Sequence, residues 1–409
     1  MTEPTMHSVR LSTTFPLLLT TAIGLLATDL YLPAIPIVTD ALEASVEHTQ
    51  YTLVAFFAAF SAFQLVYGAL AQRFNASVIL ALAIALLAIG SLIGALAQSI
   101  ETLIAARLIQ GVGASAGAAI VPGVVRRLFD KRASVRIITF VGVFDSCIPA
   151  LAPIAGVAMI VSLGWRSTFW VLTLVAVVSC VSLLRIRDKT PAIDRREPGG
   201  GFIRQSFSHY GAVLRNGRFL TIAGSYASAF GALMLLVGTA PQILDIHFGR
   251  DMSGFVIMQL IMVAAFMVGS VAAPAFIDRY TLAVANSIGV TMLAVTSVGL
   301  VLIYTAILPQ NVEWYVAVLL PSQIGLGLRF GGSMAEAIGA CEGREAAASA
   351  LSSFLCFVLA AIGNALAAPF VEGGIAPVVY GSFVFAVMSL AAHLASLRIV
   401  TARPSPHRP

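Results

Sequence analysis

Residues 77–97 read SVILALAIALLAIGSLIGALA and contain no charged side chain. A hydrocarbon layer about 30 Å thick is crossed by roughly 20 helical residues, each rising about 1.5 Å. Backbone groups in lipid must be hydrogen-bonded within the segment, and a barrel strand would need only about 9–11 residues. This run therefore predicts a membrane-spanning helix.

Eleven further apolar runs of similar length occur along the chain, which is 59% hydrophobic and 11% charged. A soluble domain averages about 25% charged residues, so this composition excludes an ordinary soluble enzyme. We predict an all-α membrane protein with twelve membrane-spanning helices. Their expected ranges are 15–36, 50–71, 77–97, 102–125, 137–161, 167–184, 219–242, 254–277, 281–305, 314–338, 346–370 and 375–397.

Basic residues are distributed unevenly between the predicted helices. If the N-terminus is cytoplasmic, only Arg166 and Arg250 fall in loops on the opposite side. Excess lysine and arginine in cytoplasmic loops sets the orientation of a membrane protein, so we expect both termini in the cytoplasm. The bases are spread over several loops without interleaved aromatic residues, so the net charge of +5 does not indicate a nucleic-acid partner.

One long polar stretch, RIRDKTPAIDRREPGGG at 185–201, lies within a linker that we place at 185–218. It separates six predicted helices from six. The expected organisation is an N-terminal bundle at 1–184 and a C-terminal bundle at 219–409.

The two halves carry faint internal similarity. GALAQR at 68–73 matches PAFIDR at 274–279, and GVG at 111–113 matches GLG at 325–327. Two pseudo-symmetric six-helix bundles are typical of a transporter that works by alternating access, with its substrate near the membrane midplane.

Charged residues inside the predicted helices need a reason, because each costs about 2.5–3.5 kcal/mol at a helix centre on insertion scales. Asp29 and Arg107 reach similar depths from opposite sides of the bilayer, so we expect their side chains to meet. Burial favours a neutral carboxyl group, whereas a neighbouring cation favours the charged form. A group balanced between the two can load and release a proton.

Asp145 repeats the local pattern of Asp29, since Pro33 follows Asp29 and Pro149 follows Asp145 by one turn. A proline clashes with the carbonyl four residues earlier, so a kink is expected beside each acid. The helical rise places Asp145 close to the membrane midplane. Proton coupling by Asp29, Arg107 and Asp145 is one interpretation, and the alternative is that these groups only pair to hold helices together.

Aromatic and amide side chains in the predicted helices suit an amphipathic ligand, although such side chains also face lipid or neighbouring helices. The candidates for substrate binding are Tyr31, Phe56, Gln64, Tyr226, Gln242 and Arg329. Arg329 would suit an anionic or polar substrate. It lies two helical turns from Glu336, so these two residues could instead pair through a bridging group.

Several segments resemble motifs of the major facilitator superfamily. Asp29-Leu-Tyr-Leu-Pro-Ala-Ile-Pro36 is similar to the first-helix motif of its bacterial drug/proton antiporter branch, the bicyclomycin and chloramphenicol resistance type. Arg107-Leu-Ile-Gln-Gly-Val-Gly113 resembles the fourth-helix motif, whose arginine is tied to proton coupling. Pro149-Ala-Leu-Ala-Pro-Ile-Ala-Gly156 resembles the antiporter motif of the fifth helix, with Ala152 in place of a usual glycine. Gly164-Trp-Arg166 also fits this branch.

The loop between the second and third helices departs from the family pattern. It reads GALAQRFNAS at 68–77, whereas relatives read Gly-x-Leu-x-Asp-Arg-x-Gly-Arg-Arg or Lys. In relatives this loop latches the outward-facing state through charge pairs, so gating is expected to differ here. The residues to which the resemblance assigns gating or motif roles are Gly68, Arg73, Gly111, Gly113, Pro149, Pro153, Gly156, Asp278 and Arg279.

The resemblance implies proton-coupled efflux of small amphipathic molecules such as antibiotics across a bacterial inner membrane, by a monomer with no cofactor beyond the proton gradient. The alternative is a dedicated exporter of an endogenous metabolite such as a siderophore or an amino acid derivative, and the altered loop and Arg329 lean that way. A membrane-embedded enzyme and a channel are disfavoured, because the sequence has no nucleophile elbow, phosphate-cradling loop or filter-like segment. The four cysteines have no metal-ligand spacing, so we expect no metal site.

Overall fold

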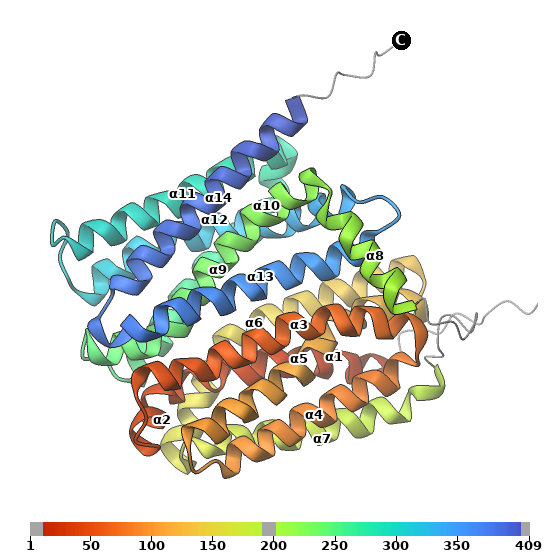
Figure 1. Ribbon diagram of the computed structural model, residues 1–409, viewed down its shortest axis with the longest axis horizontal. Coiled ribbons are helices and arrows are strands. Elements are labelled where there is room, and N and C mark those ends of the chain that lie inside the picture. The colour runs from red at the N-terminus through yellow and green to blue at the C-terminus, as the bar shows by residue number, and fades with distance from the viewer. Residues whose placement is uncertain (1–10, 190–201, 402–409) are drawn as a thin grey trace, which may run out of the picture. The chain divides into compact units, whose positions relative to one another are not determined.

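The computed structural model describes residues 11–189 and 202–401, and within these ranges it contains helices and no strand (Figure 1). The prediction of an all-α fold is confirmed. The elements are α1 (Leu11–Asp29), η1 (Leu32–Ala34), α2 (Ile35–Ala41), α3 (Val46–Arg73), α4 (Ala76–Leu96), α5 (Ile100–Leu128), α6 (Lys131–Leu163), α7 (Arg166–Arg185), η2 (Arg187–Lys189), α8 (Phe202–Leu214), α9 (Gly217–Ile246), α10 (Met252–Arg279), α11 (Leu282–Tyr304), α12 (Val312–Gly339), α13 (Glu345–Ala367), η3 (Ala368–Gly373) and α14 (Ala376–Thr401).

Each predicted membrane span coincides with a long helix or, for the first span, with α1, η1 and α2 together. Eleven segments of the described chain are long and apolar enough to cross a membrane, which makes this a multi-pass membrane protein. α12 has 28 residues and matches the tenth predicted span, but it is not among the eleven. Pro321, Gln323, Arg329 and several glycines make it more polar than its neighbours.

Contacts between helices divide the chain into two units, Met1–Gly199 and Gly200–Pro409. The boundary falls inside the predicted linker at 185–218. Part of that linker is helical, because α8 occupies Phe202–Leu214, and this helix is not anticipated by the sequence analysis. Residues 190–201 of the linker lie outside the described chain.

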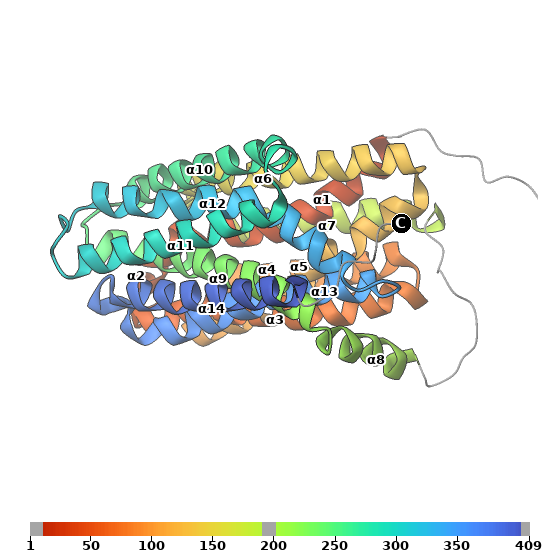
Figure 2. The same ribbon diagram turned by 90° about the horizontal axis from the view of Figure 1, so that it is seen from above.

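Close helix packing organises each unit. In the N-terminal unit α5 packs against α3 and α4, and in the C-terminal unit α12 lies alongside α10 and α11 (Figure 2). A side chain at Gly113 of α5 would collide with the carbonyl oxygen of Ala83 in α4, and one at Gly327 of α12 would collide with that of Phe266 in α10. Small residues at these points allow the helix backbones to approach one another.

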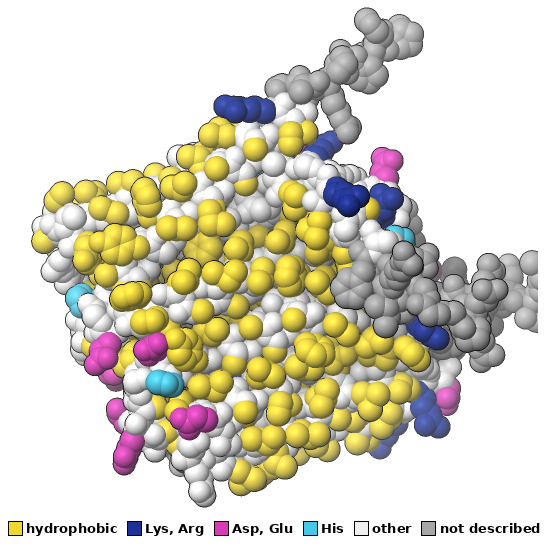
Figure 3. Space-filling view, viewed as in Figure 1, with side chains coloured by type: hydrophobic (Ala, Val, Ile, Leu, Met, Phe, Trp, Pro, Cys, Tyr) yellow, Lys and Arg dark blue, Asp and Glu magenta, His cyan; other side chains and the backbone are white. Residues whose placement is uncertain are grey.

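Charged side chains collect at the ends of the helices. The first turns of α3, α5 and α12 carry Glu47, Glu101 and Glu313, whereas the last turns of α3, α5, α7, α10 and α14 carry arginine. In the view of Figure 3 hydrophobic side chains cover most of the helical surface, and charged side chains lie toward the helix ends.

Candidate functional site

The first membrane segment is interrupted directly after Asp29, where α1 ends and a short 3-10 turn follows. Pro33 has no N–H to donate to the carbonyl of Asp29, so the α-helical ladder cannot continue there. The N–H of Tyr31 donates to the carbonyl of Thr28 at 3.1 Å. The carbonyl of Ala27, which an uninterrupted helix would pair with that N–H, is therefore open to another donor.

Arg107 of α5 donates to the carbonyl that the break leaves open. Its Nη1 donates to the oxygen of Ala27 at 2.7 Å and to Oε1 of Gln110 at 2.8 Å. The guanidinium also lies over the rings of Tyr31 and Phe56, 4.7 and 4.4 Å from their centroids, and such contacts favour a buried cation. The side chain is fully buried, and its Nε and Nη2 have no hydrogen-bond partner in the described chain.

The expected direct contact between Asp29 and Arg107 is not formed. Arg107 is bonded to Ala27, two residues before Asp29, and no ion pair involves Asp29 in the part of the chain that the structure describes. Asp29 is buried, and its Oδ2 lacks a hydrogen-bond partner there. The helix break explains this arrangement, because it offers the arginine a neutral carbonyl oxygen in place of the carboxylate.

Asp145 lies apart from this group, at the contact between α6 and α1. Its Oδ1 accepts a hydrogen bond from Oγ1 of Thr21 at 3.2 Å. The expected kink does not interrupt α6, which continues as one helix past Pro149 and Pro153. The structure therefore brings Arg107 close to the break beside Asp29 and does not place Asp145 among the partners of either.

The candidate substrate residues of the N-terminal unit are buried within it. Tyr31 and Phe56 are 0% and 1% exposed, and they enclose the guanidinium of Arg107. The hydroxyl of Tyr31 also shares a hydrogen bond with that of Thr52 at 2.9 Å. Gln64 is buried two turns farther along α3, with no partner for its Oε1 in the described chain. Tyr31 and Phe56 thus hold the arginine, and a contact with substrate remains a prediction.

In the C-terminal unit, Tyr226 and Gln242 of α9 are also buried. Tyr226 contacts the ring of Phe330 in α12, with centroids 5.7 Å apart, and Phe330 stacks on Phe230 at 5.9 Å. Phe230 in turn contacts Phe357 of α13 at 5.3 Å. This aromatic cluster is not anticipated by the sequence analysis.

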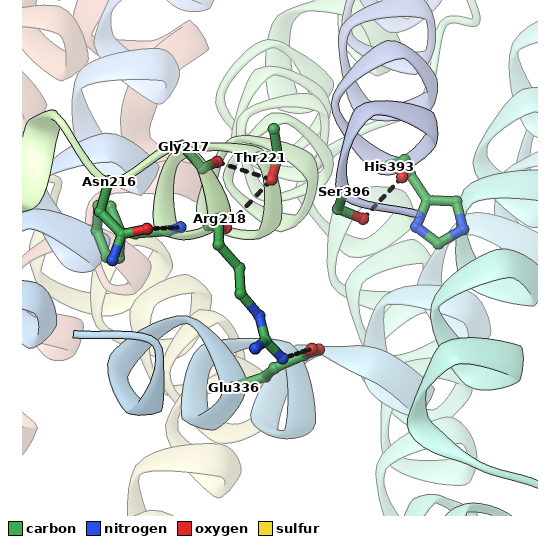
Figure 4. Close-up of polar contacts among 8 residues, drawn as sticks. Asn216, Gly217, Arg218, Thr221, Glu336, His393 and Ser396 are labelled. Atoms are coloured by element: carbon green, nitrogen blue, oxygen red, sulfur yellow. Dashed lines mark hydrogen bonds and ion pairs between the residues drawn. The ribbon is translucent and has the colours of Figure 1, made fainter. Parts of the chain in front are cut away.

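Arg329 is held inside the C-terminal unit by neutral groups. Its Nη1 donates to Oγ of Ser225 at 3.0 Å, and its Nη2 donates to the carbonyl of Ser225 at 3.2 Å and to Oγ of Ser389 at 2.9 Å. Glu336 does not pair with it. Figure 4 shows that Glu336 instead forms an ion pair with Arg218 of α9, at 3.3 Å.

The arginines of the two matching loop motifs lie at equivalent helix ends. Arg73 and Arg279 are the last residues of α3 and α10, and each lies over the next aromatic ring in the chain, Phe74 at 5.7 Å and Tyr280 at 5.4 Å. Asp278 is exposed beside Arg279. Gly68 lies within the last two turns of α3. Their gating roles remain predictions.

The motif glycines of α5 and α6 lie at close helix contacts. A side chain at Gly111 would collide with the carbonyl oxygen of Phe56. A Cβ at Gly156 would lie 2.8 Å from the carbonyl oxygen of Leu30, directly after the break in α1. Pro153 is buried one turn before Gly156, and Pro149 is half-buried. The fifth-helix motif therefore packs against the interrupted segment.

Gln110 and Thr21 are two of the polar contact residues that the sequence analysis does not predict. Gln110 follows Arg107 by one turn in the same motif, so helical spacing alone identifies it as a partner. Thr21 carries no such signal, because its contact with Asp145 joins helices far apart in the sequence.

Comparison with known proteins supports a transporter. The family model of the Major Facilitator Superfamily matches residues 17–367. The chain is 30% identical over 254 residues to the uncharacterized MFS-type transporter YdgK of Bacillus subtilis, covering 59% of this chain and 62% of that protein. It is 26% identical over 247 residues to the multidrug transporter MdfA of Yersinia pestis, covering 60% and 59%. These matches thus span about three fifths of each relative. It is also 27% identical over 165 residues to the multidrug resistance protein MdtL of Escherichia coli, covering 40% of this chain and 42% of that protein.

Solved structures show the same fold. The nucleoside transporter NupG superposes with a TM-score of 0.69 at 12% identity, covering 95% of this chain and 100% of that chain. A D-xylose–proton symporter superposes with a TM-score of 0.69 at 15% identity, covering 95% and 97%. These relatives and structural neighbours are transporters and not enzymes, and the chain belongs to the major facilitator superfamily of membrane transporters.

Proposed function

We propose that this transporter exports small amphipathic molecules, antibiotics among them, in exchange for protons. The observation that carries the proposal is the state of Asp29, which is 7% exposed and whose Oδ2 has no hydrogen-bond partner in the described chain. A buried charge without a partner is costly, so the neutral acid suits this arrangement. The charged form suits a conformation in which water or a cation reaches the carboxyl group. A group with these two states can carry a proton.

Arg107 supplies the cation for this exchange. Its Nη1 is bonded to Ala27, two residues from Asp29, while Nε and Nη2 have no partner in the described residues. A hydrogen bond from a guanidinium to a carboxylate is stronger than one to a neutral carbonyl. Loss of the proton from Asp29 therefore favours a shift of the guanidinium toward the acid, and protonation reverses it.

We propose a bacterial inner membrane as the location, with both termini in the cytoplasm. That orientation places the arginine-bearing last turns of α3, α5, α7, α10 and α14 on the cytoplasmic side, as the distribution of basic residues in membrane proteins favours. The partners are then protons, a small-molecule substrate and the lipid bilayer. A monomer driven by the proton gradient alone suffices, with no other cofactor.

Two observations favour antibiotics over an endogenous metabolite as the substrates to test first. The relatives MdfA and MdtL are named for multidrug transport and multidrug resistance. Arg329, which would suit an anionic or polar substrate, already donates three hydrogen bonds to Ser225 and Ser389.

The test uses purified protein in proteoliposomes with an imposed pH gradient and chloramphenicol as the probe. We expect the native protein to move protons when chloramphenicol is added, and Asp29→Asn to abolish this proton movement. Asp40→Asn, at an exposed acid near the end of α2, serves as the matched control and should behave like the native protein. Undiminished proton movement in Asp29→Asn would remove Asp29 from the mechanism. Transport by the native protein that does not depend on the pH gradient would contradict proton antiport.

A further inference from the structure

A buried histidine lies inside the C-terminal unit, apart from the group around Asp29 and Arg107. His393 of α14 is 6% exposed. It follows Ser389, an acceptor of Arg329, by one helical turn, so it lies on the same side of α14 as that acceptor. Ionisable side chains inside membrane-spanning helices are rare and costly. The proposed exchange mechanism does not use this one.

The hydrogen bond of the His393 ring identifies which nitrogen carries the hydrogen. Oγ of Ser287 in α11 donates to the carbonyl of Ala283 at 3.0 Å. A hydroxyl has a single hydrogen, so the same oxygen accepts the bond that joins it to Nε2 of His393 at 2.9 Å. Nε2 is therefore the donor, and Nδ1 keeps its lone pair. No hydrogen bond to Nδ1 comes from the described residues, so it is free to accept a proton.

The charged side chains that act on the His393 ring both belong to α12. Burial and the nearby Arg329 oppose a positive charge on the ring, whereas Glu336 favours one. Among the other neighbours of α14, α11 contains no charged residue. The acids on the remaining elements that pack against α14 are exposed, namely Asp245 of α9, Glu345 of α13 and Glu372 of η3. The balance between Arg329 and Glu336 therefore decides whether the ring takes up a proton.

Glu336 already has a partner in Arg218, the second residue of α9. Their ion pair of 3.3 Å ties the start of α9 to α12, and the two side chains are 37% and 28% exposed. Figure 4 shows this pair together with His393 on the neighbouring helix α14. His393 precedes Arg398, in the last turn of α14, by five residues or about 7.5 Å of helix. Water at this end of the helices can bring a proton close to the ring.

We propose that Nδ1 of His393 is a proton-binding site separate from Asp29, and that the bound proton weakens the ion pair between Arg218 and Glu336. Binding adds one proton to a lone pair and breaks no covalent bond. The imidazolium is then a second cation that competes with Arg218 for the carboxylate of Glu336. Acid conditions at this end of the protein thus loosen the contact between α9 and α12. The proposal goes beyond proton antiport and does not depend on it.

Histidine nitrogen NMR of the full-length protein in detergent tests the proton site directly. The resonance that disappears in His393→Gln belongs to His393, and we expect it to titrate between about pH 4.5 and 7. Arg218→Gln frees Glu336 and should move the midpoint about half a pH unit higher, whereas Glu336→Gln should move it about as far lower. His209→Gln, at an exposed histidine of α8, is the control and should leave the midpoint unchanged.

Hydrogen exchange of the backbone N–H groups at residues 221–223 of α9 reports on the ion pair. Native protein and His393→Gln are compared at the same pH, so that the intrinsic exchange rate cancels. At pH 5 we expect about two- to fivefold faster exchange in the native protein, the effect of losing one partly exposed ion pair. At pH 8 the two should be equal. Glu336→Gln, which lacks the pair, should exchange faster at both pH values.

Three results overturn the proposal. The first is a His393 resonance that does not titrate between about pH 4.5 and 8. The second is a midpoint that Arg218→Gln and Glu336→Gln leave unchanged or move in the opposite directions. The third is equal exchange at residues 221–223 in the native protein and His393→Gln at pH 5. Arg218 and Glu336 are partly exposed, so their variants still provide the test if His393→Gln does not fold.

Discussion

Arg107 donates through Nη1 to the carbonyl oxygen of Ala27 at 2.7 Å, across the contact between α5 and α1. The bond exists because the 3-10 turn after Asp29 redirects the N–H of Tyr31 to Thr28 and leaves Ala27 unpaired within its own helix. Arg107 thus stabilises the helix break by donating to the carbonyl oxygen that the break leaves open.

Arg107→Lys should reduce gradient-driven transport about tenfold or more. A lysine ammonium is a compact charge and cannot lie flat between the rings of Tyr31 and Phe56 while donating to Ala27. Initial uptake rates in proteoliposomes give the readout. Arg166→Lys is the matched control, because Arg166 donates to the carbonyl of Ala97 at 2.8 Å and lies over Trp165 at a helix end. Equal losses in both variants would argue against a special role for Arg107.

Gln110→Leu should lower the free energy of unfolding by about 1–3 kcal/mol, the cost of leaving buried polar groups unsatisfied. Gln110 accepts from Arg107 and donates from Nε2 to Oγ of Ser91 at 2.8 Å. Unfolding of the detergent-solubilised protein, followed by tryptophan fluorescence, measures the change. A double-mutant cycle with Ser91→Ala should be clearly non-additive, and strict additivity would show that the two side chains are not coupled.

Gly113→Ala should strongly reduce the yield of folded protein, because a methyl group there collides with the carbonyl of Ala83. Gly142→Ala adds the same methyl group where no atom lies within 4 Å, so it should leave the yield unchanged. Size-exclusion profiles of the two variants, compared at equal expression, distinguish the sites. Similar profiles would mean that α4 and α5 can separate at little cost.

Ser389→Ala should destabilise the C-terminal unit by about 1.5–3 kcal/mol, because the buried, charged Arg329 loses its hydrogen bond to the Ser389 hydroxyl. Ser396→Ala, one control in the same helix, removes only a bond from Oγ to the carbonyl of His393 and should cost less (Figure 4). Thermal unfolding in detergent gives the comparison. A larger loss for Ser396→Ala would contradict the role assigned to Arg329.

Asp251→Asn tests a pH effect at the start of α10, outside the membrane-spanning segments. The side chain of Asp251 accepts hydrogen bonds from the hydroxyl of Ser253 and the N–H groups of Ser253 and Gly254, and these lower its pKa. A folded-state pKa below the unfolded one stabilises the protein above about pH 4, and this contribution is lost as the pH falls through the folded value. The native protein should therefore unfold at a higher temperature than the variant at pH 6, with the difference shrinking toward pH 3. A constant difference would contradict the capping role.

The membrane helices can be predicted from the sequence, because an apolar run of this length has few alternative structures in lipid. The run at 77–97, for example, matches α4 within one residue at each end. α8 was missed, although Ile203, Phe207, Tyr210 and Leu214 follow helical spacing. The polar composition around them favoured a linker, and the amphipathic pattern was the overlooked signal.

The candidate site can be predicted from the sequence only in part. The rise per residue gives the depth of Asp29 and Arg107, but not the direction in which each side chain points around its helix axis. Pro33 predicts a break near Asp29, yet the carbonyl that bonds to Arg107 belongs to Ala27. Which backbone group is left open depends on a local choice between 3-10 and α-helical pairing, and an apolar pattern carries no information about that choice.

Each unit keeps its own buried arginine, and every hydrogen bond described for Arg107 and Arg329 ends on a group of the same unit. A gene divided at the boundary between Gly199 and Gly200 would give two polypeptides. Each would contain its buried arginine, Arg107 or Arg329, together with all the hydrogen-bond acceptors described for it. Co-expression of the two fragments in one cell should then restore export, because their reassociation would not have to rebuild either set.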